Sequence, residues 1–132
     1  MSRPTVLCVA LPADKLRHVR LACMRLSVMV QVAEDADLCQ PLGALCGLAP
    51  KLTDAPSPAA PFPGEMLIMA GLNRQQAERL LAALKQARVH LPLKAVLTPT
   101  NAAWDCFRLY QELTAERAAI QGGQTADHTT GS

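Results

Sequence analysis

A strand–helix–strand pattern occurs twice in this chain, once on each side of a proline-rich stretch. In the first copy, a continuous apolar run over residues 6–10 predicts a buried strand, and a β-branched run over 28–32 predicts a second strand. Pro12 suits the first position of the helix between them, where its missing N–H is not needed. The core-facing residues of that helix follow i, i+3, i+7 spacing: Leu16, Val19, Cys23 and Leu26.

The second copy follows the same order. Residues 66–70 and 93–97 predict two strands, and the helix between them begins at Asn73, which with Gln76 has the pattern of a capping box. The core-facing stripe of this helix consists of Ala77, Leu80, Leu81, Leu84 and Ala87. At an offset of about 60 residues, the two copies align Leu7 with Leu67, Ala10 with Ala70, Val19 with Leu80, and Cys23 with Leu84.

Two β-α-β units in one short chain predict an α/β protein of the α+β class. We expect a two-layer sandwich of sheet and helices, ferredoxin-like in its simplest form. A C-terminal helix over residues 102–120 and a short helical piece near 35–45 would be additions to that plan. The alternative is a small all-parallel sheet in three layers, because long connections also permit parallel pairing.

The length of 132 residues and an apolar content of 50% suit a single domain with a sizeable core. We place that domain at residues 1–120, with unit one at 4–48 and unit two at 65–120. Between the units, residues 49–64 form a linker or mobile loop, because five prolines there exclude helix and central strand. Residues 121–132 are predicted to be a disordered tail.

The net charge of +2 hides an uneven distribution. Residues 1–25 carry a local charge of +4, residues 26–65 carry −4, and residues 66–132 carry +2. The small total argues against nucleic acid as the partner, and so does an aromatic content of only 3%. The longest early apolar run, residues 5–11, is too short for a membrane span or a signal peptide, so we expect a cytoplasmic protein that does not contact a membrane.

The cysteines and histidines do not form an obvious catalytic or metal-binding set. Five cysteines, an odd number without any C-x-x-C pair, predict reduced and mostly buried thiols. His18, His90 and His128 are isolated from possible nucleophiles and carboxylates. We therefore expect no metal and no cofactor, and an enzyme, using Lys94 or a cysteine, is the third and least favoured possibility.

The densest local pattern is the run Leu-Lys-Ala-Val-Leu-Thr-Pro-Thr-Asn over residues 93–101, which predicts a strand, a polar turn and a helix start. Asn101 is the expected N-cap of the terminal helix, and Asp105 lies in its first turn. A lysine, hydroxyl groups and helix N–H groups at one strand end could bind a phosphate or carboxylate. The candidate ligand-binding residues are Lys94, Thr98, Thr100 and Asn101. The simpler alternative is that they only form the turn and cap the helix.

This run, with the strand at 66–70 and Trp104 just after it, resembles a bacterial family known only as a domain of unknown function. The resemblance covers residues 65 to about 118, and extends less clearly to residues 40–45 in the first half. It implies the same fold and a bacterial cytoplasmic setting. It implies no activity, cofactor or catalytic residue.

Two further segments have structural interpretations. Residues 40–47 lack a phosphate-binding pattern and predict a tight helical turn in which Gly43 allows close packing; the alternative is the rim of a small-molecule site. An aromatic stripe at a spacing of three lies on the terminal helix: Trp104, Phe107 and Tyr110. The stripe covers the core or, alternatively, forms a dimer surface.

These observations support two functional hypotheses. The first is a non-catalytic module that binds a small anionic or polar ligand, or a partner protein, at the turn from Lys94 to Asn101. The second is an interaction protein without a ligand, which assembles, for example as a homodimer, through its C-terminal helix.

Overall fold

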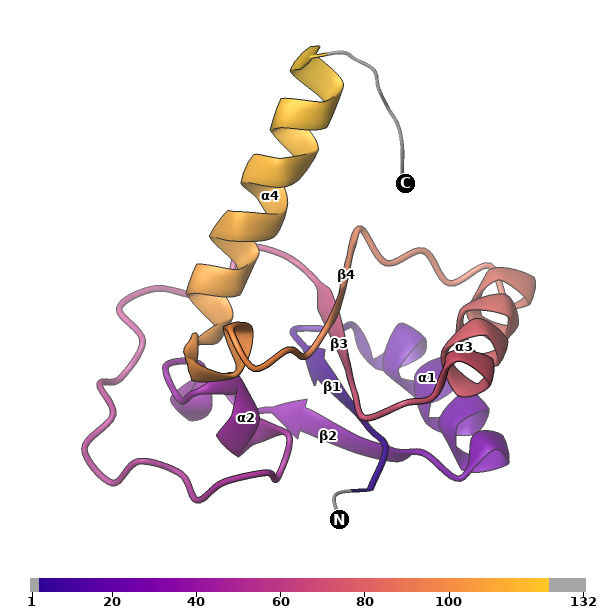
Figure 1. The fold of residues 1–132 in the computed structure, drawn as a ribbon, viewed down its shortest axis with the longest axis horizontal. Coiled ribbons are helices and arrows are strands. Elements are labelled where there is room, and N and C mark those ends of the chain that lie inside the picture. The colour runs from indigo at the N-terminus through magenta and orange to yellow at the C-terminus, as the bar shows by residue number, and fades with distance from the viewer. Residues whose placement is uncertain (1–2, 124–132) are drawn as a thin grey trace.

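The computed structural model describes residues 3–123, which form one sheet with helices on both faces (Figure 1). In chain order the elements are β1 (Thr5–Val9), α1 (Ala13–Leu26), β2 (Met29–Ala33), the 3-10 helix η1 (Asp35–Asp37), α2 (Leu42–Leu45), β3 (Met66–Ala70), α3 (Arg74–Gln86), β4 (Leu93–Val96), the 3-10 helix η2 (Asn101–Ala103) and α4 (Cys106–Gly123). The predicted α+β sandwich, with two β-α-β units and a C-terminal helix, is confirmed.

The strands lie in the order β2-β1-β3-β4. Within each unit the two strands are parallel neighbours, and the units meet through the antiparallel pair β1–β3. This pair rules out the all-parallel alternative. It also differs from the simplest ferredoxin-like arrangement, in which the two strands of a unit are split by a strand of the other. Two residues separate α1 from β2 and six separate α3 from β4, and in both units the chain returns beside the strand that it left.

The two units are related by an approximate two-fold axis. Thr5 pairs with Met29 in unit one, and Met66 pairs with Leu93 in unit two, so the two units correspond at an offset of 61 residues up to the end of the helices. The predicted alignment of Leu7 with Leu67 and Ala10 with Ala70 is therefore wrong by one residue. A shift of one position matters because it moves a strand residue to the other face of the sheet.

Backbone conformation repeats with the same offset. Ala10 and Gly71 both have positive φ, at 59° and 75°, and so do Ser27 and Arg88, at 58° and 60°. The N–H of Val28 donates to the carbonyl of Cys23 at 2.9 Å, and the N–H of Val89 donates to that of Leu84 at 2.9 Å. Both helices thus end in the same motif, in which a hydrogen bond closes a loop of six residues. A residue with left-handed backbone conformation, here Ser27 or Arg88, is common at this position of a helix C-terminus. The positive φ of Arg88 needs no functional explanation.

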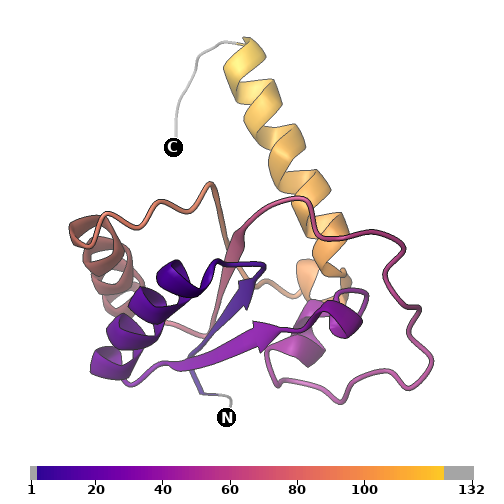
Figure 2. The same cartoon turned by 180° about the vertical axis from the view of Figure 1, so that it is seen from behind.

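Two apolar cores lie on opposite faces of the sheet. β1 and β3 are apolar or small at every position and are buried throughout, as expected of strands covered on both sides. On one face, α1 and α3 pack against Val6, Cys8, Leu67 and Met69. On the other face, α2 and the start of α4 cover Leu7, Val9, Met66 and Ile68. Figure 2 shows α1 and α3 side by side, away from α4.

The proline-rich linker forms neither helix nor strand between α2 and β3, and it is attached at both ends. Near its start, the buried Gln40 side chain donates to the carbonyl of Leu52 at 2.8 Å and accepts from its N–H at 2.7 Å. Near its end, the ring of Phe62 packs on Phe107 and Tyr110, with ring centroids 5.5 and 5.2 Å apart. α4 continues to Gly123, so it includes the first three residues of the predicted tail. The remainder of that tail, with His128, lies outside the described residues.

Candidate functional site

The turn after β4 is held together by Asn101, which is only 8% exposed. Its Nδ2 donates to the carbonyl of Val96 at 3.1 Å, and its Oδ1 accepts from the N–H of Thr98 at 2.8 Å. The N–H of Asn101 itself donates to Thr98 Oγ1 at 3.1 Å. These bonds engage the polar groups of the Asn101 side chain within the turn, as the simpler sequence interpretation expects.

The terminal helix does not begin at Asn101. Residues 101–103 form the separate 3-10 helix η2, and α4 starts at Cys106. Asp105 Oδ1 accepts from the N–H of Arg108 at 2.8 Å, the bond typical of an N-cap. The prediction that Asn101 caps this helix is therefore wrong, and Asp105 has that role. The side chain of Asn101 bonds back toward β4 because the extended Trp104 interrupts the chain before α4.

Lys94 is separated from the other predicted ligand-binding residues. It pairs with Leu67 in the ladder between β3 and β4, and Leu67 belongs to the core on the α1/α3 face. Lys94 lines a cavity on that face, whereas Thr98, Thr100 and Asn101 do not line it. The ligand-binding assignment of those three residues stays a prediction.

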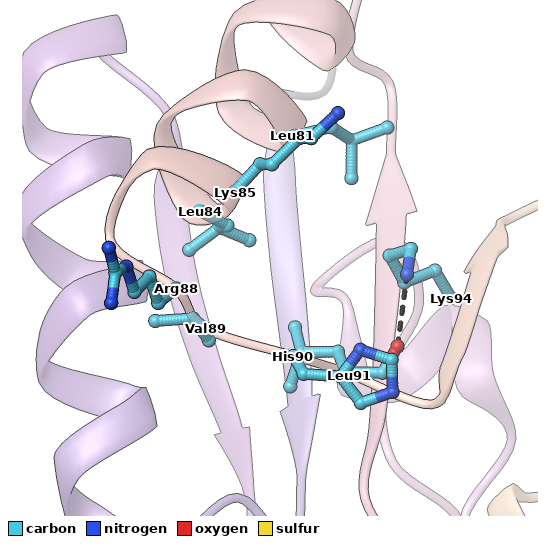
Figure 3. A pocket seen from close by; sticks show the side chains of 8 residues that line it. All are labelled: Leu81, Leu84, Lys85, Arg88, Val89, His90, Leu91 and Lys94. Carbon is cyan, nitrogen blue, oxygen red and sulfur yellow. Dashed lines mark hydrogen bonds between the residues drawn. The ribbon is translucent and has the colours of Figure 1, made fainter.

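The cavity lies between α3 and β4 and has a volume of about 400 Å³ (Figure 3). Its apolar lining consists of Leu81, Leu84, Val89 and Leu91, and its polar lining of Lys85, Arg88, His90 and Lys94. Figure 3 shows Lys85 coming from α3 and Lys94 from β4, with His90 and Leu91 on the loop between them. Lys94 Nζ donates to the carbonyl of Leu91 at 2.9 Å. No acidic residue is among the lining residues, and three of the four polar ones are Lys or Arg.

The cavity coincides with the one interruption of the two-fold relation between the units. In unit one, Val28 leads directly into β2 at Met29. In unit two, residues 90–92 intervene between Val89, the counterpart of Val28, and Leu93. Two of these three additional residues, His90 and Leu91, line the cavity. The sequence analysis did not predict this cavity. A comparison of the two copies could have indicated it, because the second copy alone has an insertion, at residues 90–92, after the basic residues Lys85 and Arg88.

The helices on this face also provide a positive electrostatic environment. Residues 13–26 and 74–88 contain eight basic side chains and two acidic ones. Lys15 on α1 reaches the loop beside the cavity, where its Nζ lies 2.6 Å from the carbonyl oxygen of His90 and 2.6 Å from Glu65 Oε1. Basic side chains gathered on one face raise the local concentration of anions there.

The aromatic stripe lies on the opposite face. Trp104, Phe107 and Tyr110 are partly buried and pack with Phe62 against the α2/α4-side core. The guanidinium carbon of Arg108 lies 4.6 Å from the centroid of the Trp104 ring, a cation–π arrangement. Packing against the core explains these rings, and their assignment as an interaction surface stays a prediction. The tight turn predicted at 40–47 contains α2, and Gly43 lies against the carbonyl of Ala102, where an added Cβ would be 3.4 Å from that oxygen.

The cysteines are free thiols, and four of the five are buried. Burial raises the pKa of Cys8 and Cys106 to about 12, and that of Cys23 and Cys46 to about 11. Thiols with such pKa values remain protonated at neutral pH and are poor nucleophiles. Within residues 3–123, no three His, Cys, Asp or Glu side chains are close enough together to hold a metal ion. In the same range, no helix is long and apolar enough to cross a bilayer.

Comparison with known protein families gives a match in the second half of the chain. Residues 65–120 match the family model described as Domain of unknown function (DUF3783). The match begins just before β3, takes in the cavity and the turn after β4, and ends within α4. The resemblance read from the sequence is thus confirmed as similarity to a domain of unknown function. No curated protein and no solved structure matches the chain.

Proposed function

We propose that the protein is a non-catalytic module that binds a small anion with an apolar body in the cavity between α3 and β4. The observation that carries the proposal is the composition of the cavity lining, which combines four apolar residues with Lys85, Arg88 and Lys94 and contains no carboxylate. Ligand sites typically have a largely apolar wall and a few charged groups that orient the ligand. The volume of about 400 Å³ suits a single ring or a short chain.

Each part of the cavity has a role in this proposal. Lys94 provides the central cation, since its ammonium group has one observed protein acceptor, the carbonyl of Leu91, and two further N–H donors. Lys85 and Arg88 approach from the end of α3, where basic side chains also interact favourably with the helix dipole. Leu81 and Leu84 contact the apolar part of the ligand. The anionic group is a carboxylate or a phosphate, which these cations would bind alike.

The Thr-Pro-Thr-Asn turn supports the site indirectly. By fixing the chain immediately after Val96, Asn101 holds the end of the edge strand that carries Lys94. This modifies the sequence-based hypothesis: the ligand lies at the Lys94 end of the motif, and the turn is structural. We also assign the module to the bacterial cytoplasm, where its five free thiols would stay reduced.

Titration with benzoate and with the neutral benzyl alcohol tests the proposal. In ¹H–¹⁵N correlation spectra at low salt, we expect benzoate to shift the amides of His90, Leu91 and Lys94, and benzyl alcohol to bind more weakly. Lys94→Gln should weaken benzoate binding about five-fold, the effect of losing one partly exposed ion pair.

The matched control is Arg74→Gln, which removes the same charge from the exposed first turn of α3, away from the cavity. It should leave benzoate affinity almost unchanged. Equal weakening by both variants, or no shift at residues 90–94, would contradict the proposal. Replacing benzoate by phenyl phosphate distinguishes a carboxylate site from a phosphate site.

The alternative, assembly through the C-terminal helix, has less support. Over residues 106–119 of α4, no large apolar side chain is among the exposed ones. Light scattering at high protein concentration distinguishes the two hypotheses. A stable dimer that dissociates when α4 is altered would favour assembly, and a monomer would remove the alternative.

A further inference from the structure

A second cavity lies where the parallel strands β1 and β2 end. Ala10 directly follows β1, Asp35 comes two residues after the end of β2, and both line a cavity of about 630 Å³. The linker supplies the opposite wall through residues 57–62. Figure 1 shows the linker passing around the end of the sheet toward which β2 points. The space outside the carboxyl ends of parallel strands is a common position for ligands in α/β proteins.

The wall formed by the linker has a defined position. The double hydrogen bond between Gln40 and Leu52 attaches the linker five residues before the wall segment, and the contact of Phe62 with Phe107 and Tyr110 fixes the end of the wall. Five prolines between residues 50 and 63 further restrict the backbone in this region. The cavity is therefore bordered by a segment with little conformational freedom to lose when a ligand binds.

The chemistry of this cavity is opposite to that of the first. Most lining side chains are apolar and many are small, which leaves room for a ligand: Ala10, Ala36, Leu38, Pro58, Ala59, Ala60, Pro61 and Phe62. Asp35 is the single ionisable side chain in the lining, and Ser57 is the other polar one. Among residues 3–123, Asp35 forms no ion pair, whereas Asp37 is paired with Lys51 at 2.8 Å.

We infer that this second cavity binds a small organic cation, an ammonium ion with an apolar substituent. Asp35 would pair with the ammonium group, and the Phe62 ring would offer its negative face to the same charge. Leu38 and Pro58 would enclose the apolar substituent. The inference does not depend on the anion site, because the two cavities share no residue.

Three probes with the same ring and different charge test the inference: benzylammonium, benzyl alcohol and benzoate. In ¹H–¹⁵N spectra at low salt, benzylammonium should shift the amides of Asp35, Ala36 and Ala59, and should bind at least about five-fold more tightly than benzyl alcohol. Asp35→Asn should remove this preference for the cation. Asp35 is exposed and, within the described part of the chain, its side chain makes no hydrogen bond, so the variant is expected to fold.

Glu34→Gln is the matched control, because it removes a neighbouring negative charge that does not line the cavity. It should retain most of the preference for benzylammonium. Equal loss in both variants, equal affinity for benzyl alcohol and benzylammonium, or no shift at residues 35–36 and 57–62 would each overturn the inference. Benzoate binding should be unaffected by Asp35→Asn, so failure at one cavity is distinguishable from failure at the other.

Discussion

Leu7 lies directly opposite Ile68 in the central antiparallel ladder, and each residue is the counterpart of the other in the two β-α-β units. The approximate two-fold axis of the fold therefore passes between them. Both side chains are fully buried in the core on the α2/α4 face. The repeat at an offset of 61 residues relates β1 to β3 and α1 to α3, and β2 corresponds to β4 after a further shift of three residues.

Truncation of either residue at this axis should be strongly destabilising. We expect Leu7→Ala and Ile68→Ala each to lower the free energy of unfolding by about 2–5 kcal/mol, because each leaves a cavity in a close-packed core. Facing positions interact, so the double variant should depart from the sum of the two effects. Urea denaturation measures this. Val96→Ala, at a side chain 58% exposed on an edge strand, should change stability little; a comparable loss there would argue against this core.

Asn101→Ala separates a structural from a ligand-binding role for the turn. Removal of a buried side chain with two hydrogen bonds should cost about 1–3 kcal/mol of stability. Benzoate affinity of the folded protein should remain near that of the parent. Thr100→Ala, at an exposed residue whose side chain makes no observed cap bond, should change stability by less than about 0.5 kcal/mol. Lost binding in a stable Asn101→Ala protein would restore the original ligand-binding prediction.

Buried thiols should make the protein less stable at high pH. Because the folded pKa of Cys8 is raised to about 12, the native thiol keeps its proton while the unfolded thiol ionises near its ordinary value of about 9. Its contribution to stability is complete below pH 9 and is lost as pH rises toward 12, by up to about 1.4 kcal/mol per pH unit. Urea melts at pH 8 and pH 10 should therefore show a decline that is shallower in Cys8→Ala. An equally steep decline in that variant would assign the effect to other groups.

Alkylation should distinguish one cysteine from the rest. Cys39 is the single cysteine with intermediate exposure, and the other four are buried. Iodoacetamide at pH 8 should modify Cys39 first in the native protein, and the remaining four only after denaturation. Peptide mass mapping identifies the modified site. Cys39→Ser should leave the native protein almost unreactive, and rapid labelling of Cys106 in that variant would contradict the burial described above.

The β-α-β units were predictable because local patterns and burial agree in them. Apolar runs marked the strands within about one residue, and the capping box at Asn73 is present as predicted. The alignment of the units was wrong by one residue in the strands because β1 and β3 are buried on both faces. Without alternation between apolar and polar residues, the sequence of a central strand does not show which side chains share a face.

The site was harder to predict because it depends on contacts between distant segments. Asn101 is a residue type that is common at N-cap positions. Whether it caps a helix or closes a turn depends on where Trp104 packs. Lys94 was recognised as a candidate, whereas Lys85, Arg88 and His90 join it only through the pairing of β4 with β3. The second cavity, which Asp35 lines, could not be predicted because one of its walls is the linker. The composition of the linker indicates an extended chain but does not show where that chain lies.

The ladder between β1 and β3 has a consequence for the architecture as a whole. A chain of half this length, with one β-α-β unit, could build the same four-stranded sheet as a homodimer, whose symmetry axis would pass where Leu7 meets Ile68. The present chain is the single-chain equivalent of that homodimer. A true homodimer would carry every insertion twice, whereas here residues 90–92 exist in one half alone. Joining the halves is what permits this insertion, and the cavity that His90 and Leu91 line, to occur on one side of the sheet alone.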